Sequence, residues 1–204
     1  MSKSCKLVIM DAAPLIKLAV VRRLDLLFSF GLTVFIPDEV LFEAIEKQSW
    51  MDGIGPTPDK VYMKEWVEVH KETKQVICRE TFIGSSAKES RESGRLTAKN
   101  YPDNLGELSA DSVFLERANL GFGNAPAVLM LDDYEATDMF KSKRADVYFF
   151  TTYSFLLQLE KSRLVDSAEA IWSDILLELP TASKMQDPDL TGPLRAGTIV
   201  EFRP

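Results

Sequence analysis

Acidic side chains follow two of the apolar segments that the sequence predicts to be strands. Asp11 comes directly after the run KLVIM (6–10), and Asp132 and Asp133 follow the run AVLML (127–131). Open α/β sheets bind their ligands at the carboxyl ends of parallel strands, so these carboxylates are candidates for a functional site. The structural alternative is that each aspartate only caps the helix that follows it, because aspartate is a favoured N-cap residue.

Further acids lie on two predicted helices. Glu43 belongs to the helix predicted at 38–47, and Glu107 and Asp111 lie four residues apart on the helix predicted at 104–120, on one side of it. Carboxylates that converge at strand ends repel one another unless a cation lies between them, and hard oxygen ligands suit Mg²⁺ or Mn²⁺. Such an ion favours phosphodiester hydrolysis, because it acidifies water and stabilises charge on a phosphoryl oxygen. The alternative for Glu107 is a first-turn charge that only stabilises its helix.

Strand and helix patterns alternate along the chain, which predicts a mostly parallel sheet with helices on both faces. Apolar runs predict strands at 6–10, 32–37, 66–70, 127–131, 147–150 and, in the tail, 198–202. Besides the helix that follows Asp11, amphipathic patterns predict helices at 38–47, 60–66, 104–120, 135–143, 154–164 and 167–179.

The stretch 71–103 is polar. Residues 71–99 lack sustained apolar periodicity, so we expect them to be mobile or ordered only by a neighbour, with Val76, Ile77 and Phe82 pinning one short strand. Residues 71–99 carry seven Lys or Arg and four Asp or Glu, a local excess of positive charge in a chain of net charge −7. One interpretation is a flap that guides RNA phosphates, and the alternative, which we favour, is a tolerated surface insertion. The basic candidates are Lys88, Arg91 and Arg95 here, and Lys17, Arg22 and Arg23 on the first helix, where a solvated face is the alternative.

Composition excludes several classes of protein. The 204 residues suffice for one domain, and no apolar run approaches the roughly 18 residues that span a bilayer. Cys5 and Cys78 are too few for a disulfide framework or a zinc cluster, and His70 is the single histidine, which argues against Ser-His-Asp chemistry. The acidic balance disfavours binding of nucleic acid through a broad basic surface. With no signal-peptide pattern at the start, we expect a cytoplasmic protein.

Five segments, in order, resemble the motifs of the PIN-domain nucleases, especially the bacterial and archaeal members. They cover much of residues 6–50 and 104–165, and their order is more specific than any one of them. The segments are VIMDAAPLIKLAVVRRLDLL (8–27), IPDEVLFEAI (36–45), LGELSADSVFLERANLG (105–121), VLMLDDYEAT (128–137) and FFTTYSFLLQLEKSRLV (149–165).

The resemblance implies a three-layer α/β/α fold with a central, mostly parallel sheet, and a metal-dependent endoribonuclease. It gives metal-binding or catalytic roles to Asp11, Glu43, Asp111 and Asp133. Glu107 and Asp132 become their neighbours or alternates, and Thr152 a hydrogen-bond donor to water or phosphate. The implied cofactor is Mg²⁺ or Mn²⁺.

The implied partners are an RNA substrate, a small antitoxin protein if the chain is the toxin of a toxin–antitoxin pair, and a second copy of the chain. No membrane partner is expected. Compact members of the family lack most of 71–103 and end near Val165, so we predict one domain over 1–180 with an insertion at about 71–103 and a tail at 181–204.

Two other functions compete with the nuclease. The first is a catalytically idle PIN-like module that binds a partner protein or RNA, which the joint presence of Asp11, Glu43, Asp111 and Asp133 disfavours. The second is a phosphatase that uses Asp11 as an aspartyl nucleophile. It is disfavoured because position 13 is alanine, where such enzymes commonly carry a second aspartate.

Overall fold

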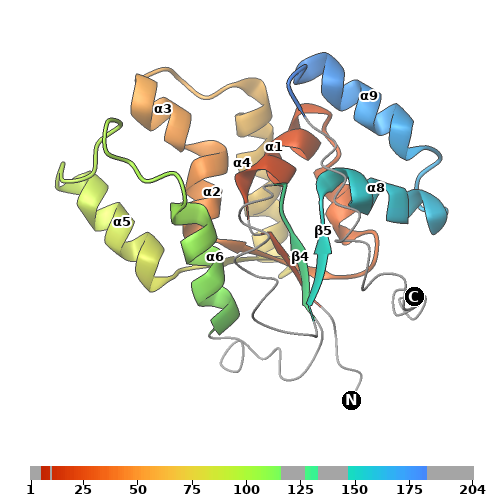
Figure 1. Ribbon diagram of the computed structural model, residues 1–204, viewed down its shortest axis with the longest axis horizontal. Helices are drawn as coiled ribbons and strands as arrows, with labels where there is room; N and C mark the ends of the chain where they lie inside the picture. The colour runs from red at the N-terminus through yellow and green to blue at the C-terminus, as the bar shows by residue number, and fades with distance from the viewer. Residues whose placement is uncertain (1–5, 10, 116–126, 133–146, 183–204) are drawn as a thin grey trace.

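The structure, a computed structural model, describes residues 6–9, 11–115, 127–132 and 147–182 (Figure 1). Three predictions lie outside the described residues: the helix at 135–143, the tail strand at 198–202 and the position of Asp133. Within the described part, no helix is long and apolar enough to cross a membrane.

Five parallel strands form one sheet in the order β3-β2-β1-β4-β5. Their bounds are β1 Lys6–Ile9, β2 Thr33–Pro37, β3 Val76–Arg79, β4 Ala127–Met130 and β5 Val147–Phe150. Val8 of β1 pairs in register with Phe35 on one side and Leu129 on the other. The expected three-layer α/β fold with a parallel central sheet is therefore confirmed.

Helices cover the sheet on both faces, as a buried parallel sheet requires. Figure 1 shows α2, α3, α5 and α6 in one half of the molecule and α8 and α9 in the other. The helices are α1 Ala12–Val20, α2 Asp38–Ile45, α3 Lys47–Asp52, α4 Pro58–Glu72, α5 Phe82–Glu92, α6 Leu105–Leu115, α8 Thr152–Lys161 and α9 Ala168–Glu178, with a 3-10 turn at Leu24–Phe28.

The core lies between the sheet and its helices. Leu7, Ile36 and Leu129 of the central strands are fully buried, as are Leu15 and Leu18 of α1. This packing fixes the carboxyl ends of β1, β2 and β4, and thereby the backbone positions of the acids that follow them.

The strand predicted at 66–70 was wrong, because these residues form the last part of α4. Trp66 and Val67 have strand propensity, but together with Met63 they bury one helical face at the spacing i, i+3, i+4. His70 lies on the same helix, where Nδ1 is 2.9 Å from Gln75 Oε1. This contact gives His70 a structural role, because it joins α4 to the residue that precedes β3.

The structure differs from the expectation that 71–99 is mobile or ordered only by a neighbour, because α5 packs against α2 and α6 of the same chain. Val76 and Ile77 do lie in the predicted short strand, which is the edge strand β3. Phe82 instead begins α5, and its side chain is 81% exposed. Residues that are distant from α5 in the sequence hold it in place. The pattern of apolar residues within 71–103 does not reveal these contacts.

Candidate active site

Asp11 and Asp132 lie side by side at the carboxyl end of the sheet. Parallel pairing of Ile9 with Met130 brings the ends of β1 and β4 level. The Asp11 carboxylate accepts hydrogen bonds from the backbone N–H of Ala13 at 3.2 Å, through Oδ1, and of Asp132 at 3.4 Å, through Oδ2. Asp11 therefore caps helix α1 through Oδ1 and contacts the end of the neighbouring strand through Oδ2.

Asp132 accepts the hydrogen bonds of a buried network. Its carboxylate accepts hydrogen bonds from Lys17 Nζ at 2.8 Å, from the Thr152 N–H at 2.7 Å and from the Thr152 hydroxyl. Lys17 and Thr152 are both buried, and Lys17 Nζ also lies 5.5 Å from the centre of the Trp172 ring. Asp132 thus joins α1, β4 and α8.

This network changes two sequence-based interpretations. Lys17 is not a surface cation available to RNA, and it is not part of a solvated face, because it is buried in an ion pair. The Thr152 hydroxyl donates to Asp132, so its single proton is used within the protein. The role of Thr152 toward water or phosphate stays a prediction.

Glu43 projects from the second turn of α2 toward α6. Its Oε1 accepts a hydrogen bond from the Tyr101 hydroxyl at 2.9 Å and lies 3.8 Å from Lys47 Nζ. Its Oε2 lies so close to Gly106 of α6 that a Cβ on that residue would be 2.7 Å away. Glycine at 106 is therefore what allows this approach.

The pKa of Glu43 is raised above its ordinary value. Burial is the main cause, and the negative charges of Glu39 and Asp11 raise it further, against the opposing effects of Lys47 and the Tyr101 hydrogen bond. Asp11 and Glu43 therefore share one electrostatic environment, although they are 32 residues apart in the chain. A cation between these two carboxylates would offset their mutual repulsion.

Glu107 and Asp111 lie one turn apart on α6, as their spacing predicts. Both side chains are partly buried, with Glu107 Oε2 and Asp111 Oδ1 shielded from solvent. Since α6 packs against α2, both acids belong to the helix pair that also carries Glu43.

The donor set fits Mg²⁺ or Mn²⁺ in its chemistry, because carboxylate oxygens are the hard ligands that these ions prefer. Among the residues that the structure describes, however, no group of three or more His, Cys, Asp or Glu side chains is arranged to hold a metal ion. Asp133, the fourth expected ligand, lies outside those residues. Convergence of Asp11, Glu43, Asp111 and Asp133 on one ion stays a prediction.

Asp38 was not among the predicted site residues. It follows β2 just as Asp11 follows β1, which was the signal that could have identified it. Its carboxylate accepts hydrogen bonds from the Thr81 N–H at 3.0 Å, the Thr81 hydroxyl at 2.9 Å and the Ser109 hydroxyl at 3.0 Å. Asp38 therefore ties α2 to the start of α5 and to α6.

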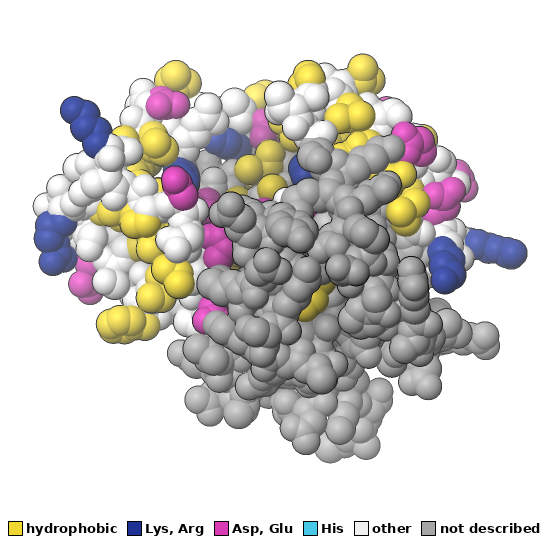
Figure 2. All heavy atoms as spheres, viewed as in Figure 1, with side chains coloured by type: hydrophobic (Ala, Val, Ile, Leu, Met, Phe, Trp, Pro, Cys, Tyr) yellow, Lys and Arg dark blue, Asp and Glu magenta, His cyan; other side chains and the backbone are white. Residues whose placement is uncertain are grey.

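Arg91 is not available to guide RNA as the sequence analysis considered. Its guanidinium pairs with the buried carboxylate of Glu39, and it lies 3.6 Å from the centre of the Phe42 ring. Lys88 and Arg95, by contrast, are exposed. Figure 2 shows that Lys and Arg side chains on the described part of this face stand mainly at its outer edges.

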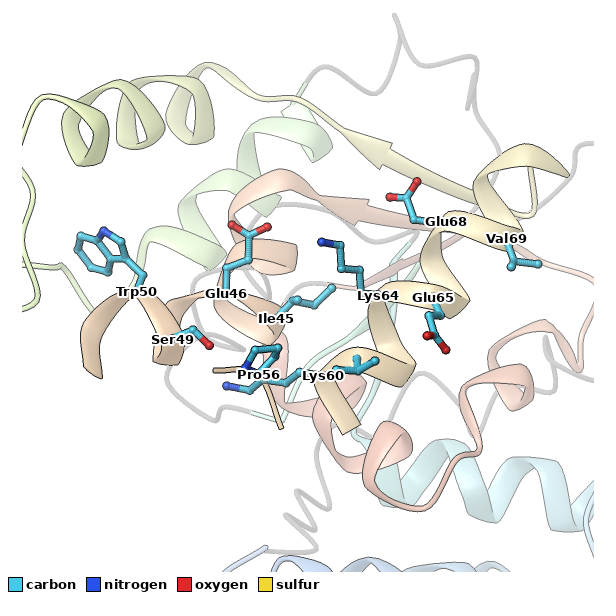
Figure 3. A pocket seen from close by; sticks show the side chains of 11 residues that line it. Ile45, Glu46, Ser49, Trp50, Pro56, Lys60, Lys64, Glu65, Glu68 and Val69 are labelled. Atoms are coloured by element: carbon cyan, nitrogen blue, oxygen red, sulfur yellow. The ribbon is translucent and has the colours of Figure 1, made fainter. Parts of the chain in front are cut away.

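Two grooves of about 860 Å³ each flank α2 and α3. One runs between α3 and α4 and has Ile45, Trp50 and Val69 among its lining residues (Figure 3). None of the predicted site residues lines it. The other is bordered by Asp38, Glu39 and Lys88, among others, and so lies beside the helix that carries Glu43.

Comparison with known families identifies the first part of the chain. Residues 7–83 match a family model described as a PIN domain. The match runs from β1 to the start of α5 and so includes Asp11 and Glu43. No curated protein and no solved structure matches the chain. The predicted domain limits, 1–180 with an insertion at about 71–103 and a tail at 181–204, stay a prediction, although the match extends into the stretch 71–103.

Proposed function

We propose that the chain is a metal-dependent endoribonuclease of the PIN-domain family, because residues 7–83 match the model of a PIN domain and PIN domains are generally nucleases. The proposed reaction is hydrolysis of RNA phosphodiester bonds with Mg²⁺ or Mn²⁺ as cofactor. The observation that supports the proposal is the placement of the acids: Asp11 lies beside Asp132 at the carboxyl end of the sheet, and Glu43, Glu107 and Asp111 lie on the packed helix pair α2 and α6.

We assign the cation to Asp11, Glu43, Asp111 and Asp133, with Glu107 as their neighbour on α6. When bound, the ion would acidify water and neutralise charge on the scissile phosphate. Asp132 and Thr152 act through position, because the Asp132 N–H donates to Asp11 while the Asp132 carboxylate is held by Lys17 and Thr152.

The toxin role is the finer part of the proposal and is supported by the resemblance alone. In that role a small antitoxin protein would bind the nuclease, and a homodimer is a further candidate assembly. The competing function is an idle PIN-like module that binds a partner or RNA without cleaving it. Metal-dependent turnover of RNA separates the two.

The decisive substitution is Asp11→Asn. We expect the purified wild type to cleave a labelled single-stranded RNA in Mn²⁺ or Mg²⁺ and not in EDTA, and Asp11→Asn to lose at least about 100-fold in rate, because it removes one charge that the cation requires. Asn can still accept the hydrogen bond from Ala13, so helix α1 keeps its cap.

Asp174→Asn is the matched control, because Asp174 is exposed on α9 in the other half of the molecule. It should cleave like the wild type. A folded wild type that binds Mn²⁺ and leaves RNA intact would identify the idle module. Growth arrest by the wild type in cells, absent with Asp11→Asn, tests the toxin role.

A further inference from the structure

Tyr101 lies between two carboxylates of α2. Its hydroxyl oxygen is 2.7 Å from Glu39 Oε1 and 2.9 Å from Glu43 Oε1, so its single proton is shared between the two carboxylates. Glu39 and Glu43 are four residues apart, so they stand one above the other on the same face of the helix. Tyr101 comes from the loop between α5 and α6, outside the segment that matches the family model.

The Tyr101 ring is fixed by its surroundings. Phe42 and Trp50 lie 6.2 and 5.9 Å from it between ring centres, and Lys47 Nζ lies 4.3 Å from its centre. Below it, Glu39 is held by the ion pair with Arg91 of α5. The hydroxyl therefore has a defined position before any ligand arrives.

Two contacts then set the direction of the Glu43 carboxylate. Oε1 is held by the Tyr101 hydroxyl, with Lys47 nearby, whereas Oε2 is directed to α6 over Gly106. A glutamate side chain has three rotatable bonds, and a hydrogen bond from a rigid neighbour removes much of that freedom. The same two residues, one tyrosine and one glycine, thus define which oxygen faces α6.

We propose that Tyr101 is a positioning residue for Glu43, holding Oε1 so that Oε2 stays on the side of α6 where the divalent cation binds; this inference rests on the proposed nuclease function. Tyr101 does not itself touch the cation or the RNA. Tyr101, in a loop outside the segment that matches the family model, thereby orients Glu43, a proposed metal ligand inside that segment.

Tyr101→Phe tests the inference, because phenylalanine keeps the ring and removes only the hydroxyl. Tyr153→Phe is the matched control: the Tyr153 hydroxyl also donates to a carboxylate, Glu169, at 2.8 Å, and the ring is likewise buried, but it lies between α8 and α9. Mn²⁺ affinity of the full chain is measured by titration calorimetry. We expect Tyr101→Phe to bind Mn²⁺ about 10-fold more weakly, as is usual when a group that orients a metal ligand is removed, and Tyr153→Phe to match the wild type.

A second measurement needs no metal. The carboxyl carbon resonance of Glu43, assigned with Glu43→Gln, should shift in metal-free Tyr101→Phe and stay in place in Tyr153→Phe. Equal Mn²⁺ affinity in wild type and Tyr101→Phe, or equal losses in both variants, would overturn the inference while the nuclease function stands. A wild type that binds no Mn²⁺ overturns the proposed function instead, and an unchanged Glu43 resonance in Tyr101→Phe then overturns the positioning role as well.

Discussion

At the scale of single residues, the fold places a carboxylate where its charge is disfavoured. Glu43 is largely buried beside Glu39 and near Asp11, and its pKa is raised above the ordinary value of 4.5, with burial as the main cause. A raised pKa means that the folded chain holds this proton more tightly than the unfolded chain. The stability that the folded chain gains by binding this proton is complete below about pH 4.5. It is lost as the pH rises through the pKa that Glu43 has in the folded chain.

Glu43→Gln should therefore raise the melting temperature of the metal-free protein at neutral pH. Gln stays neutral, and its Oε1 can still accept the Tyr101 hydrogen bond. The difference from the wild type should shrink as the pH falls through the folded pKa and be smallest below about pH 4.5, where Glu43 is mostly protonated in both the folded and the unfolded chain. Thermal melts in EDTA from pH 4 to 8 measure it, with the exposed Glu65→Gln as control. A Glu43→Gln variant less stable than the wild type across this range would contradict the burial argument.

At the scale of elements, α5 is held by contacts that a local pattern does not contain. Thr81 caps α5 by accepting from the Gly84 N–H at 2.9 Å, and Asp38 accepts from Thr81. The backbone of Gly84 lies so close to Asp38 that a Cβ would be 2.2 Å from the carboxylate atoms. Asp38 cannot yield easily, since it also binds Ser109.

Gly84→Ala should consequently destabilise the protein by roughly 1–3 kcal/mol, the range of overpacked sites, although alanine within a helix normally stabilises relative to glycine. Gly55→Ala is the control, because a Cβ there meets no atom within 4 Å and its backbone is not left-handed. It should change stability by less than about 0.5 kcal/mol. Urea unfolding of both variants decides the matter, and equal midpoints would refute the close packing of α5 on α2.

The elements that the sequence predicted correctly are those whose own apolar residues, at strand or helix spacing, are buried in the core. Strands β1, β2, β4 and β5 and helices α2, α8 and α9 fall where apolar runs and caps place them. The errors have a common cause in tertiary structure. Trp66 and Val67 favour strands by propensity, yet their burial against the core selects a helix. Helix α5 and the burial of Lys17 depend on Glu39 and Asp132, partners distant in the chain.

The candidate site could be predicted only as a set of acids at strand ends. Spacing brought Glu107 and Asp111 to one side of a helix, and strand order brought Asp11 beside Asp132. The contacts that orient these acids, such as the hydrogen bond from Tyr101 to Glu43, join segments that are far apart in the sequence. A local sequence pattern does not show that such segments are close in space.

At the scale of the whole molecule, a chain of net charge −7 would have to bind the proposed RNA substrate through local fields. The groove that Asp38 and Glu39 border is also lined by the exposed Lys88, and the exposed Arg95 follows the end of α5. Of the three cations that the sequence named within 71–99, these two remain exposed, whereas Arg91 is held in a buried ion pair.

Reversing both charges, with Lys88→Glu and Arg95→Glu, should weaken binding of single-stranded RNA and flatten its dependence on salt. Removing one cation that neutralises a phosphate reduces the slope of log affinity against log salt by about 0.7, so a reduction of roughly 1.4 is expected for two. Lys64→Glu with Lys161→Glu is the control, because it changes the net charge equally at exposed positions on α4 and α8. Binding is measured in Ca²⁺, so that RNA is retained without relying on the ions proposed for cleavage. A role in guiding RNA should change the salt slope of the Lys88/Arg95 variant alone, whereas a general effect of net charge should change the slopes of both double variants. Equal slopes would therefore mean that α5 has only a structural role.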